Sequence, residues 1–449
     1  GRSLEELQLN GMHSPQSVVD AVISKMKNLE EGKWILGRGW DQNLWDRGNF
    51  PASSLLDDVV TNHPVVLTRI DGHAVWINDV VRKMIGYDEN SDPLPGGEVI
   101  NNCIFIDNAM DVIFEIIPKP DQERMTQFLK NACSYAVKNG ITQVHDAWQN
   151  ESILNGLEHL YYKGELPIRC YGMLDGKDSP LLDEWFSKGK HFGEKITVRA
   201  VKAFIDGSLG SRGAALIDPY CDDPFNTGLI LLSEDEFKSL AQRCQVNGFQ
   251  LCTHAIGDRG NRMVLDIYAK ILNGKNDRRW RIEHAQMVAD EDIPKFVDND
   301  IIPSMQPSHC TSDMRWLNER IGPDRLNRIS RWKTFINQGL KIAGGSDCPI
   351  EKGNPLLEYY AAVTRKDDTG KPQKGWQPQE KVSRVEGLKM LTTWAAYGAF
   401  EEEKVGRIKK GFDADLTILS KNILTCPEEE IPKTEVLMTM VSGEIVYRR

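Results

Sequence analysis

One pattern repeats seven times between residues 140 and 347, and it limits the folds that are open to this chain. Each repeat is a short apolar run rich in β-branched residues, followed by a loop and usually by a helical periodicity. The runs occupy residues 141–145, 166–171, 196–205, 249–254, 280–284, 301–305 and 340–343. Strand, loop, helix and strand in this order predict an α/β fold with a parallel sheet. A doubly wound sheet satisfies the seven runs, and so does an eight-stranded barrel that lacks one strand.

The segments between the runs have the spacing of helices. In one of them the apolar positions follow i, i+3, i+4 and i+7, at Phe237, Leu240, Ala241 and Cys244. Gly248 follows at the point where such a helix would end. This agreement between neighbouring segments supports the α/β interpretation.

The regions outside the repeats have a different character. Ser14 and Pro15 predict the start of a helix that runs to about residue 29, and a strand is expected at 65–69. We expect residues 1–380 to form the main domain, with an inserted cap at about 30–120. Residues 381–449 are expected to form a helix at 385–400 and a small β-rich end.

Composition excludes several classes of protein. The 449 residues carry 55 Lys and Arg against 65 Asp and Glu, and without a basic patch this balance argues against nucleic acid as a partner. No apolar run approaches the ~18 residues of a membrane helix. Nine cysteines without a C-x-x-C pair suggest reduced thiols and a cytoplasmic location, although a signal peptide before Gly1 would change that expectation. There is also no G-x-G-x-x-G and no P-loop for a nucleotide.

Several predicted strands end in residues that can bind metal. His254 and His284 end two successive runs, and Asp347 follows the last one. Functional residues of parallel α/β folds lie at the carboxyl ends of strands, so these side chains are expected to converge. A lone His in such a place is more often an ordinary loop residue, but two His and an Asp at successive ends favour a metal site. Imidazole and carboxylate together suit Zn²⁺, Mn²⁺ or Fe²⁺, and Asp347 could accept a proton from water activated there.

Lys202 lies inside the predicted strand at 196–205, among apolar neighbours such as Val201 and Phe204. An exposed lysine that extends to solvent is the ordinary alternative. If Lys202 is buried and unpaired, the pKa of its amine must fall. A neutral amine of this kind can react with carbon dioxide.

The motifs resemble the amidohydrolase superfamily, and within it the YtcJ-like branch that includes N-substituted formamide deformylases. The resemblance extends over nearly the whole chain. It rests on residues 201–212, 253–258, 281–286, 305–307 and 344–347, together with 39–41, 71–73 and 410–416. It implies a (β/α)₈ TIM-like metal-dependent hydrolase barrel with a small β-sandwich, half of which residues 381–449 would supply.

The resemblance also implies roles for individual residues. Lys202 would be carboxylated and would bridge metals, while His254 and His284 would each bind one. Asp347 would bind metal and carry protons as the catalytic residue. The implied cofactor is a divalent metal, with zinc favoured, as one or two ions.

One expected feature is missing: no His-x-His, the pair that the first barrel strand contributes in this superfamily, occurs in the chain. The seven runs correspond to family strands 2 to 8, so we expect strand 1 and half of the sandwich to precede Gly1, in an N-terminally truncated barrel. Two hypotheses follow. The first is a hydrolase of carbon–nitrogen bonds other than peptide bonds, acting on amides or N-substituted formamides. The alternative is a non-catalytic scaffold or signalling protein, or a one-metal variant that uses His254, His284 and Asp347.

Four further residues are predicted to bind a small-molecule substrate. Arg212 could hold a polar group with both arms of its guanidinium, although a salt bridge within its loop is an equal alternative. His309, after the sixth run, could polarise the substrate. His73 could reach the site from the cap, and Asp206 follows the strand that carries Lys202. The sequence leaves a homo-oligomer open.

Overall fold

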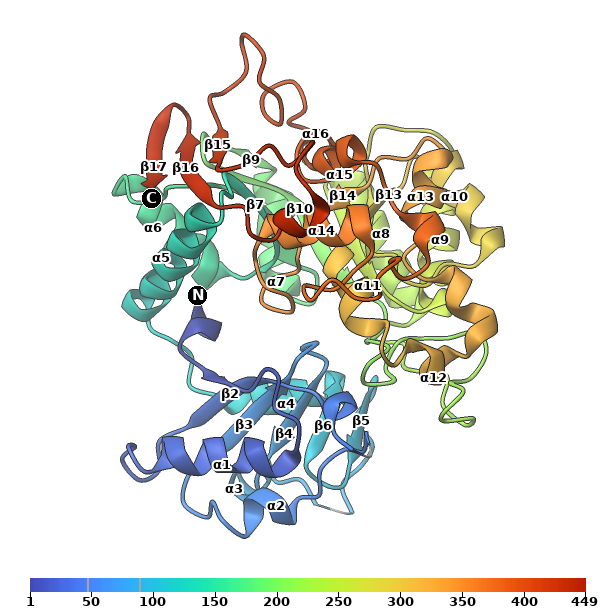
Figure 1. Ribbon diagram of the computed structural model, residues 1–449. Helices are drawn as coiled ribbons and strands as arrows, with labels where there is room; N and C mark the ends of the chain where they lie inside the picture. Colours follow the sequence, from blue (N-terminus) through green and yellow to red (C-terminus); the bar gives the residue numbers. More distant parts are fainter. Residues whose placement is uncertain (47, 89) are drawn as a thin grey trace. The chain divides into compact units, whose positions relative to one another are not determined.

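The computed structural model describes residues 1–46, 48–88 and 90–449, which form two compact units (Figure 1). The first, called here the parallel-sheet unit, contains Gly1, Pro120–Ile205 and Ser233–Arg449. The second, called the mixed-sheet unit, contains Arg2–Lys119 and Asp206–Leu232. Within the described ranges, no helix combines the length and apolar character needed to span a membrane.

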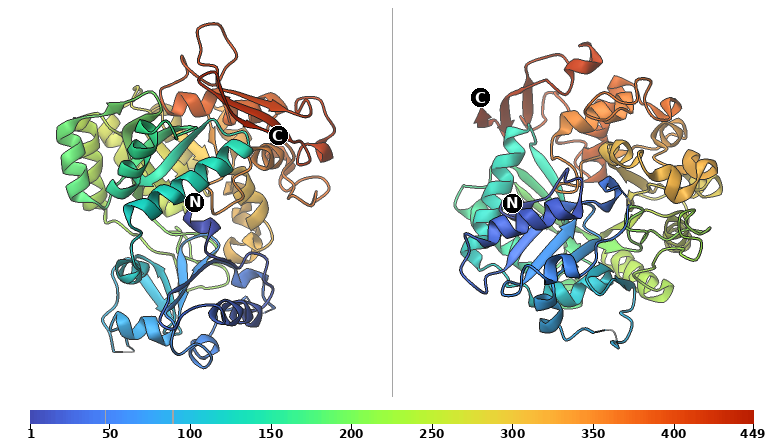
Figure 2. Two further views of the ribbon diagram at one scale, coloured as in Figure 1. Left: turned by 90° about the vertical axis from the view of Figure 1, so that its left-hand side faces the viewer. Right: turned by 60° about the horizontal axis from the view of Figure 1, so that its bottom comes forward.

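Seven parallel strands form the central sheet of the parallel-sheet unit, and they confirm the seven predicted runs. Their order across the sheet is the reverse of their order in the chain: β14, β13, β12, β11, β10, β8, β7. A doubly wound sheet would reverse its strand order part of the way across, whereas a barrel adds each strand beside the previous one. The sheet curls, as part of a TIM-like barrel would (Figure 2). The strands are β7 (Gln143–Gln149), β8 (Arg169–Asp175), β10 (Ile196–Phe204), β11 (Gln250–Ala255), β12 (Arg281–His284), β13 (Ile302–Met305) and β14 (Ala343–Gly344), and the short β9 (His191–Phe192) pairs antiparallel with β10.

Helices follow most of these strands, as the spacing predicted. In α8 (Glu234–Asn247), Phe237, Leu240, Ala241 and Cys244 are all buried. Ser233 and Glu236 form a capping box at its start, and Gly248 ends it with a φ of 71°. The other helices of this part are α5 (Gln122–Lys138), α6 (Glu151–Tyr162), α7 (Ser179–Lys188), α9 (Asp258–Leu272), α10 (Ile293–Asp298), α11 (Pro307–Asp313), α12 (Leu317–Ile321), α13 (Trp332–Asn337) and α14 (Pro355–Thr364).

The C-terminal end contains a three-stranded antiparallel sheet of β15 (Leu416–Leu419), β16 (Val436–Val441) and β17 (Glu444–Arg448). Buried Arg169, at the start of β8, holds this end of the chain in place by donating to Asp413 and Asp415, each at 2.8 Å. The single helix expected at 385–400 is instead two helices, α15 (Arg384–Met390) and α16 (Thr393–Gly398).

The mixed-sheet unit has a six-stranded sheet in the order β1, β2, β3, β4, β6, β5. Helix α1 (Pro15–Met26) begins as predicted, because the Ser14 side chain accepts from the Ser17 backbone N–H at 3.1 Å. The predicted strand at 65–69 is β3 (Val65–Arg69). The other elements are β1 (Leu7–Gln8), β2 (Ile35–Trp40), α2 (Ser54–Asp57), β4 (Ala74–Ile77), α3 (Asp79–Met84), β5 (Gly97–Ile100), β6 (Ile104–Asp107) and α4 (Asp111–Ile116).

Candidate metal centre and its surroundings

Three neighbouring strands of the parallel sheet place Lys202, His254 and His284 in one continuous set of contacts. The pairing aligns Phe204 with His254, and Ala255 with His284. The centroids of the His254 and His284 rings are 4.6 Å apart. The ring of Phe204 lies 5.3 Å from that of His254, and Lys202 Nζ lies 4.6 Å from the Phe204 centroid. The structure therefore brings together the lysine and both histidines that the sequence selected.

A glutamine fixes the ring of His284. His284 Nδ1 lies 2.7 Å from Gln306 Oε1, while the amide nitrogen of Gln306 donates to the Ser304 carbonyl at 3.3 Å. Because this second bond sets the direction of the amide, its oxygen must accept from Nδ1–H, and the lone pair of the neutral imidazole lies on Nε2. His284 also has a positive φ of 74°, which is costly for a residue with a Cβ. Ring and backbone are both held in one orientation, as second-sphere partners do for metal-binding histidines.

Lys202 is buried, with 4% of its surface exposed, as expected from its neighbours. Burial lowers the pKa of its amine below the ordinary value, and the charges of Glu283, Asp347 and Cys252 oppose that shift only in part. Among the described residues, no carboxylate forms a salt bridge with Nζ. The environment therefore shifts this amine toward its neutral, reactive form.

Asp347 is less closely associated with the histidines than the sequence suggested. It follows β14, it is exposed, and its φ is 53°. Across the described part of the chain, no three His, Cys, Asp or Glu side chains converge closely enough to hold a metal ion. His254 and His284 thus form a pair, and Lys202 is the adjacent third group. Asp347 acts on the charge of Lys202 from a greater distance.

His309 extends the row of rings, in the first turn of α11. Its ring stacks on that of His284, with 5.7 Å between centroids and an angle of 15° between planes. The buried Nε2 of His309 has no hydrogen-bond partner among the described residues. A pocket beside the two rings is lined by His284, Gln286, Met305, Gln306, His309, Ser330 and Trp332.

A buried carboxyl group supports the segment that carries His309. Glu358, in α14, is 1% exposed, and its Oε2 accepts from the Ser308 backbone N–H at 2.9 Å. Burial, with a smaller contribution from the charges of Glu351 and Asp347, raises the pKa of Glu358 to about 8, although the hydrogen bonds from Ser308 act in the opposite direction. Glu358 is therefore largely protonated at neutral pH.

The remaining three predicted residues lie in the mixed-sheet unit. His73 Nδ1 bonds Asp107 Oδ1 at 2.7 Å, and buried Asp206 is close enough for its charge to act on His73. Burial alone would lower the pKa of His73, but the bond to Asp107 and the charges of Asp107, Asp71 and Asp206 raise it overall. His73 and Asp206 are thus brought together around a residue that the sequence did not suggest.

Two glycines allow Asp107 to lie against the 206–213 segment. A Cβ on Gly207 would lie 2.1 Å from Asp107 Oδ2, and one on Gly213 would lie 2.2 Å from it. Arg212, in the same segment, holds both oxygens of Asp222 at 3.3 and 3.0 Å. The loop salt bridge considered as the alternative for Arg212 is present, and its role toward a substrate stays a prediction.

Sequence reasoning missed the roles of three contributors: Gln306, Glu358 and Asp107. Each acts through a partner distant in sequence, as Glu358 does through Ser308, 50 residues away. The only local signal was the position of Gln306 directly after a strand. Glycines near an acidic residue could have suggested a close approach, but nothing in the sequence pairs them with Asp107.

This chain is similar to several known proteins over nearly its whole length. The profile of the Amidohydrolase family matches residues 2–447. The amidohydrolase YtcJ of Bacillus subtilis (strain 168) is 29% identical over 100% of this chain and 86% of its own length. N-substituted formamide deformylase of Arthrobacter pascens is 22% identical over 96% and 82%. The crystal structure of an uncharacterized metal-dependent hydrolase from Pyrococcus horikoshii OT3 aligns with a TM-score of 0.75 and 26% identity, covering 95% of this chain and 84% of that one.

Proposed function

Because this chain belongs to the amidohydrolase family, we propose that it is a metal-dependent hydrolase of carbon–nitrogen bonds other than peptide bonds. Its substrates would be small amides or molecules resembling N-substituted formamides. The similarity to a formamide deformylase and to a metal-dependent hydrolase supports this choice.

The observation that carries the proposal is the set formed by Lys202, His254 and His284. The two rings are 4.6 Å apart, and the bond to Gln306 leaves the lone pair of His284 on Nε2, as a metal ligand requires. Lys202 has the lowered pKa that lets an amine react with carbon dioxide. These donors suit a divalent metal, and their nitrogen and oxygen chemistry favours zinc, as one or two ions.

A metal bound there would polarise the scissile carbonyl and make water a nucleophile at neutral pH. Carboxylated Lys202 would present oxygen donors beside the two imidazoles. Asp347 would accept a proton from the attacking water and transfer it to the leaving nitrogen. His309, stacked on His284, would orient the substrate. His73, Asp206 and Arg212 remain proposed substrate-binding residues of the mixed-sheet unit.

Metal content tests the role of Lys202. Purified wild-type protein should contain divalent metal, and Lys202→Ala should retain less than about a tenth of it, as measured by atomic emission. Lys195→Ala is the matched control, because Lys195 lies in the same unit and donates to the Leu166 carbonyl, away from the histidines. Unchanged metal in Lys202→Ala would contradict the proposed ligand set.

Turnover tests Asp347. Asp347→Asn should keep its fold and its metal but lose hydrolysis of N-acyl substrates by about 10²- to 10⁴-fold, the usual contribution of a general base. Asp298→Asn, at an exposed position in α10, should leave the rate unchanged. Retained activity in Asp347→Asn would remove this residue from the mechanism.

The absence of His-x-His from the chain favours a second candidate, a non-catalytic scaffold with the same fold. The two candidates differ in one measurable respect. A scaffold would contain no stoichiometric metal, and neither Lys202→Ala nor Asp347→Asn would affect turnover. The hydrolase should contain metal and should lose turnover in both variants.

A further inference from the structure

Trp148 interrupts strand β7 near its carboxyl end. The register of β7 against β8 shifts between Ala147 and Gln149, so Trp148 is the extra residue of a β-bulge. Its φ is 112°, which is a strained value for a residue with a bulky side chain. Bulges are common beside active sites, where they redirect a side chain, and such strain persists only where the surrounding structure enforces it.

Two neighbours hold the indole ring of Trp148. Burial raises the pKa of Asp175, at the end of β8, and the hydrogen bond that Asp175 accepts from the Trp148 side chain opposes that rise. Asp175 Oδ1 also accepts from the Lys177 backbone N–H at 2.9 Å. The centroids of the Trp148 and Phe204 rings are 6.0 Å apart, with 72° between the ring planes. These contacts fix the ring but leave 50% of Trp148 exposed.

Phe204 connects this ring to the candidate metal centre. The Phe204 ring lies 5.3 Å from that of His254, and Lys202 Nζ lies 4.6 Å from the Phe204 centroid. Four rings therefore form a continuous row with neighbouring centroids 4.6–6.0 Å apart: Trp148, Phe204, His254 and His284. The exposed indole is one ring removed from the first histidine of the proposed metal site.

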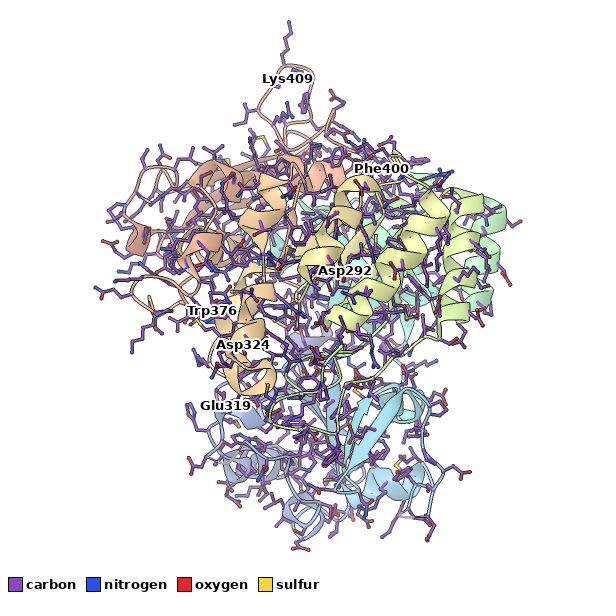
Figure 3. All side chains as sticks on the ribbon, turned by 90° about the vertical axis from the view of Figure 1, so that its right-hand side faces the viewer. Asp292, Glu319, Asp324, Trp376, Phe400 and Lys409 are labelled. Atoms are coloured by element: carbon purple, nitrogen blue, oxygen red, sulfur yellow. The ribbon has the colours of Figure 1, made fainter. Side chains whose placement is uncertain are left out.

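Exposure alone does not identify a binding surface. Ile408 is 92% exposed, and it precedes Lys409, which extends from a projecting loop in Figure 3. Single apolar side chains of this kind are ordinary on protein surfaces, and Ile408 does not have a positive φ. Trp148 differs because its backbone is strained and its ring is anchored beside the candidate site. Strain at an exposed, anchored ring indicates a role in binding.

We propose that the strained bulge presents Trp148 as a specificity-determining residue, whose ring binds a flat aromatic group of the substrate next to the carbon–nitrogen bond that is cleaved. The inference rests on the proposed hydrolase function and deepens it, because it identifies the substrates as amides or formamides with an aromatic ring. An indole offers a large, rigid apolar surface, and two aromatic rings in contact gain more than the burial of their area. A saturated ring of similar size lacks this additional gain.

Matched pairs of amides test the preference for an aromatic ring. Benzamide and cyclohexanecarboxamide place the ring on the acyl side, whereas N-phenylformamide and N-cyclohexylformamide place it on the nitrogen. Each compound is titrated into the full chain and followed by ligand-observed NMR, and kcat/KM replaces affinity for a compound that is hydrolysed. In at least one pair the aromatic member should be favoured by about threefold to tenfold, which identifies the side of the bond that contacts Trp148. Equal values within both pairs would overturn the proposal.

Variants assign the preference to Trp148. Trp148→Ala should abolish it, and Trp148→Phe should retain most of it. Phe192→Ala is the matched control, because Phe192 is 62% exposed and lies in β9, which pairs with the first residues of β10, far along that strand from Lys202. This control should leave the preference unchanged. An aromatic preference that survives Trp148→Ala would overturn the proposal.

A further variant applies if Trp148→Ala does not fold, as judged by circular dichroism. Trp148→Leu keeps a large apolar side chain but lacks the aromatic ring, so it should also lose the preference. Retention of the preference in folded Trp148→Leu would overturn the role of the indole.

Thermal unfolding tests the strain in the bulge. Glycine within a strand is normally less stable than alanine, but glycine adopts a positive φ readily. Trp148→Gly should therefore melt at or above the temperature of Trp148→Ala, although both variants lose the aromatic preference. A clearly lower melting temperature for Trp148→Gly would overturn the strained presentation of the ring.

The specificity of Trp148 and the hydrolase function can fail separately. An aromatic preference in binding that depends on Trp148, without hydrolysis of any amide or formamide, would retain the binding surface and overturn the function. Hydrolysis with the same aromatic preference in wild type and Trp148→Ala would retain the function and overturn the role of Trp148.

Discussion

Buried charge is handled in opposite ways around His73, in the mixed-sheet unit, and around Lys202 and Glu358, in the parallel-sheet unit. In the mixed-sheet unit, Arg69 is 1% exposed and pairs with Asp41 at 2.7 Å and Asp71 at 2.6 Å, and His73 pairs with Asp107. In the parallel-sheet unit, no described carboxylate forms a salt bridge with Lys202, and a backbone N–H is the hydrogen-bond donor to Glu358.

The pKa shifts follow this difference. Arg69 and His73 outweigh the effect of burial on Asp71 and lower its pKa, while Asp107 raises that of His73. At Lys202 and Glu358 of the parallel-sheet unit, burial dominates, so the pKa of Lys202 is lowered and that of Glu358 is raised to about 8. Pairing favours the charged form of a group, whereas burial without a partner shifts the group toward its neutral form, which can act as a ligand or proton carrier.

The largest expected effect comes from removing the central cation of the mixed-sheet unit. Arg69→Met leaves Asp41 and Asp71 buried without their counterion, and it should lower the free energy of unfolding by about 3–5 kcal/mol. Hydrogen exchange of the β2–β4 amides measures this loss locally. Arg82→Met is the control, since Arg82 also contacts two aspartates, Asp79 at 2.5 Å and Asp57 at 3.6 Å, but is 20% exposed. It should cost no more than about 1 kcal/mol, and a similar cost for both variants would break the comparison.

A substitution at Glu358 of the parallel-sheet unit should raise the free energy of unfolding at high pH, whereas Arg69→Met lowers it. The raised pKa of Glu358 means that its contribution to stability is complete below its ordinary value of 4.5 and is lost as pH rises through about 8. Glu358→Gln abolishes that loss, so at pH 9 it should be more stable than wild type by on the order of 2–4 kcal/mol, and nearly equal at pH 5. Urea unfolding at both values provides the measurement. Glu158→Gln, exposed on α6, should change stability by less than about 0.5 kcal/mol. Destabilisation by Glu358→Gln at both pH values would show that its carboxyl group is needed as a charge.

The smallest expected effect is a change of hydrogen exchange with pH, which is compared for one histidine of each unit. The pKa of His73 is raised, so its stabilisation is present below 6.5 and is lost as pH rises through its folded value. Burial and the adjacent Arg281 lower the pKa of His145 well below 6.5, so its contribution is present above 6.5 and is lost as pH falls. Between pH 7.5 and 5.5, hydrogen exchange should slow in the mixed-sheet unit and quicken in the parallel-sheet unit, after correction for intrinsic rates. His73→Gln and His145→Gln should each abolish the change in one unit only; a change of the same sign in both units would contradict the assignment.

The strands of the parallel sheet could be predicted from the sequence, because strand positions depend on local patterns. Short apolar runs rich in β-branched residues predicted all seven strands, and the burial of Lys202 followed from its neighbours within one strand. The convergence of Lys202, His254 and His284 could also be predicted, since successive strands of a parallel sheet end at the same edge.

Contacts across long sequence separations could not be predicted in this way. The bond from His284 to Gln306 depends on how β12 and β13 pair, and the contact of Glu358 with Ser308 depends on how α14 packs on α11. The place of residues 206–232 in the mixed-sheet unit was missed for the same reason, because their sequence reads as an ordinary loop after β10. Such features arise from packing, for which a single sequence contains no local signal.

That discontinuous segment has a consequence for synthesis on the ribosome. The mixed-sheet unit begins at Arg2 but is completed only by Asp206–Leu232, which emerge roughly 100 residues after Lys119. At the usual pace of translation the delay is on the order of ten seconds, and during it β7, β8 and β10 leave the ribosome. Residues 2–119 thus have to wait for a segment that follows three strands of the parallel-sheet unit, and chaperone dependence of the nascent chain should be greatest before Leu232 appears.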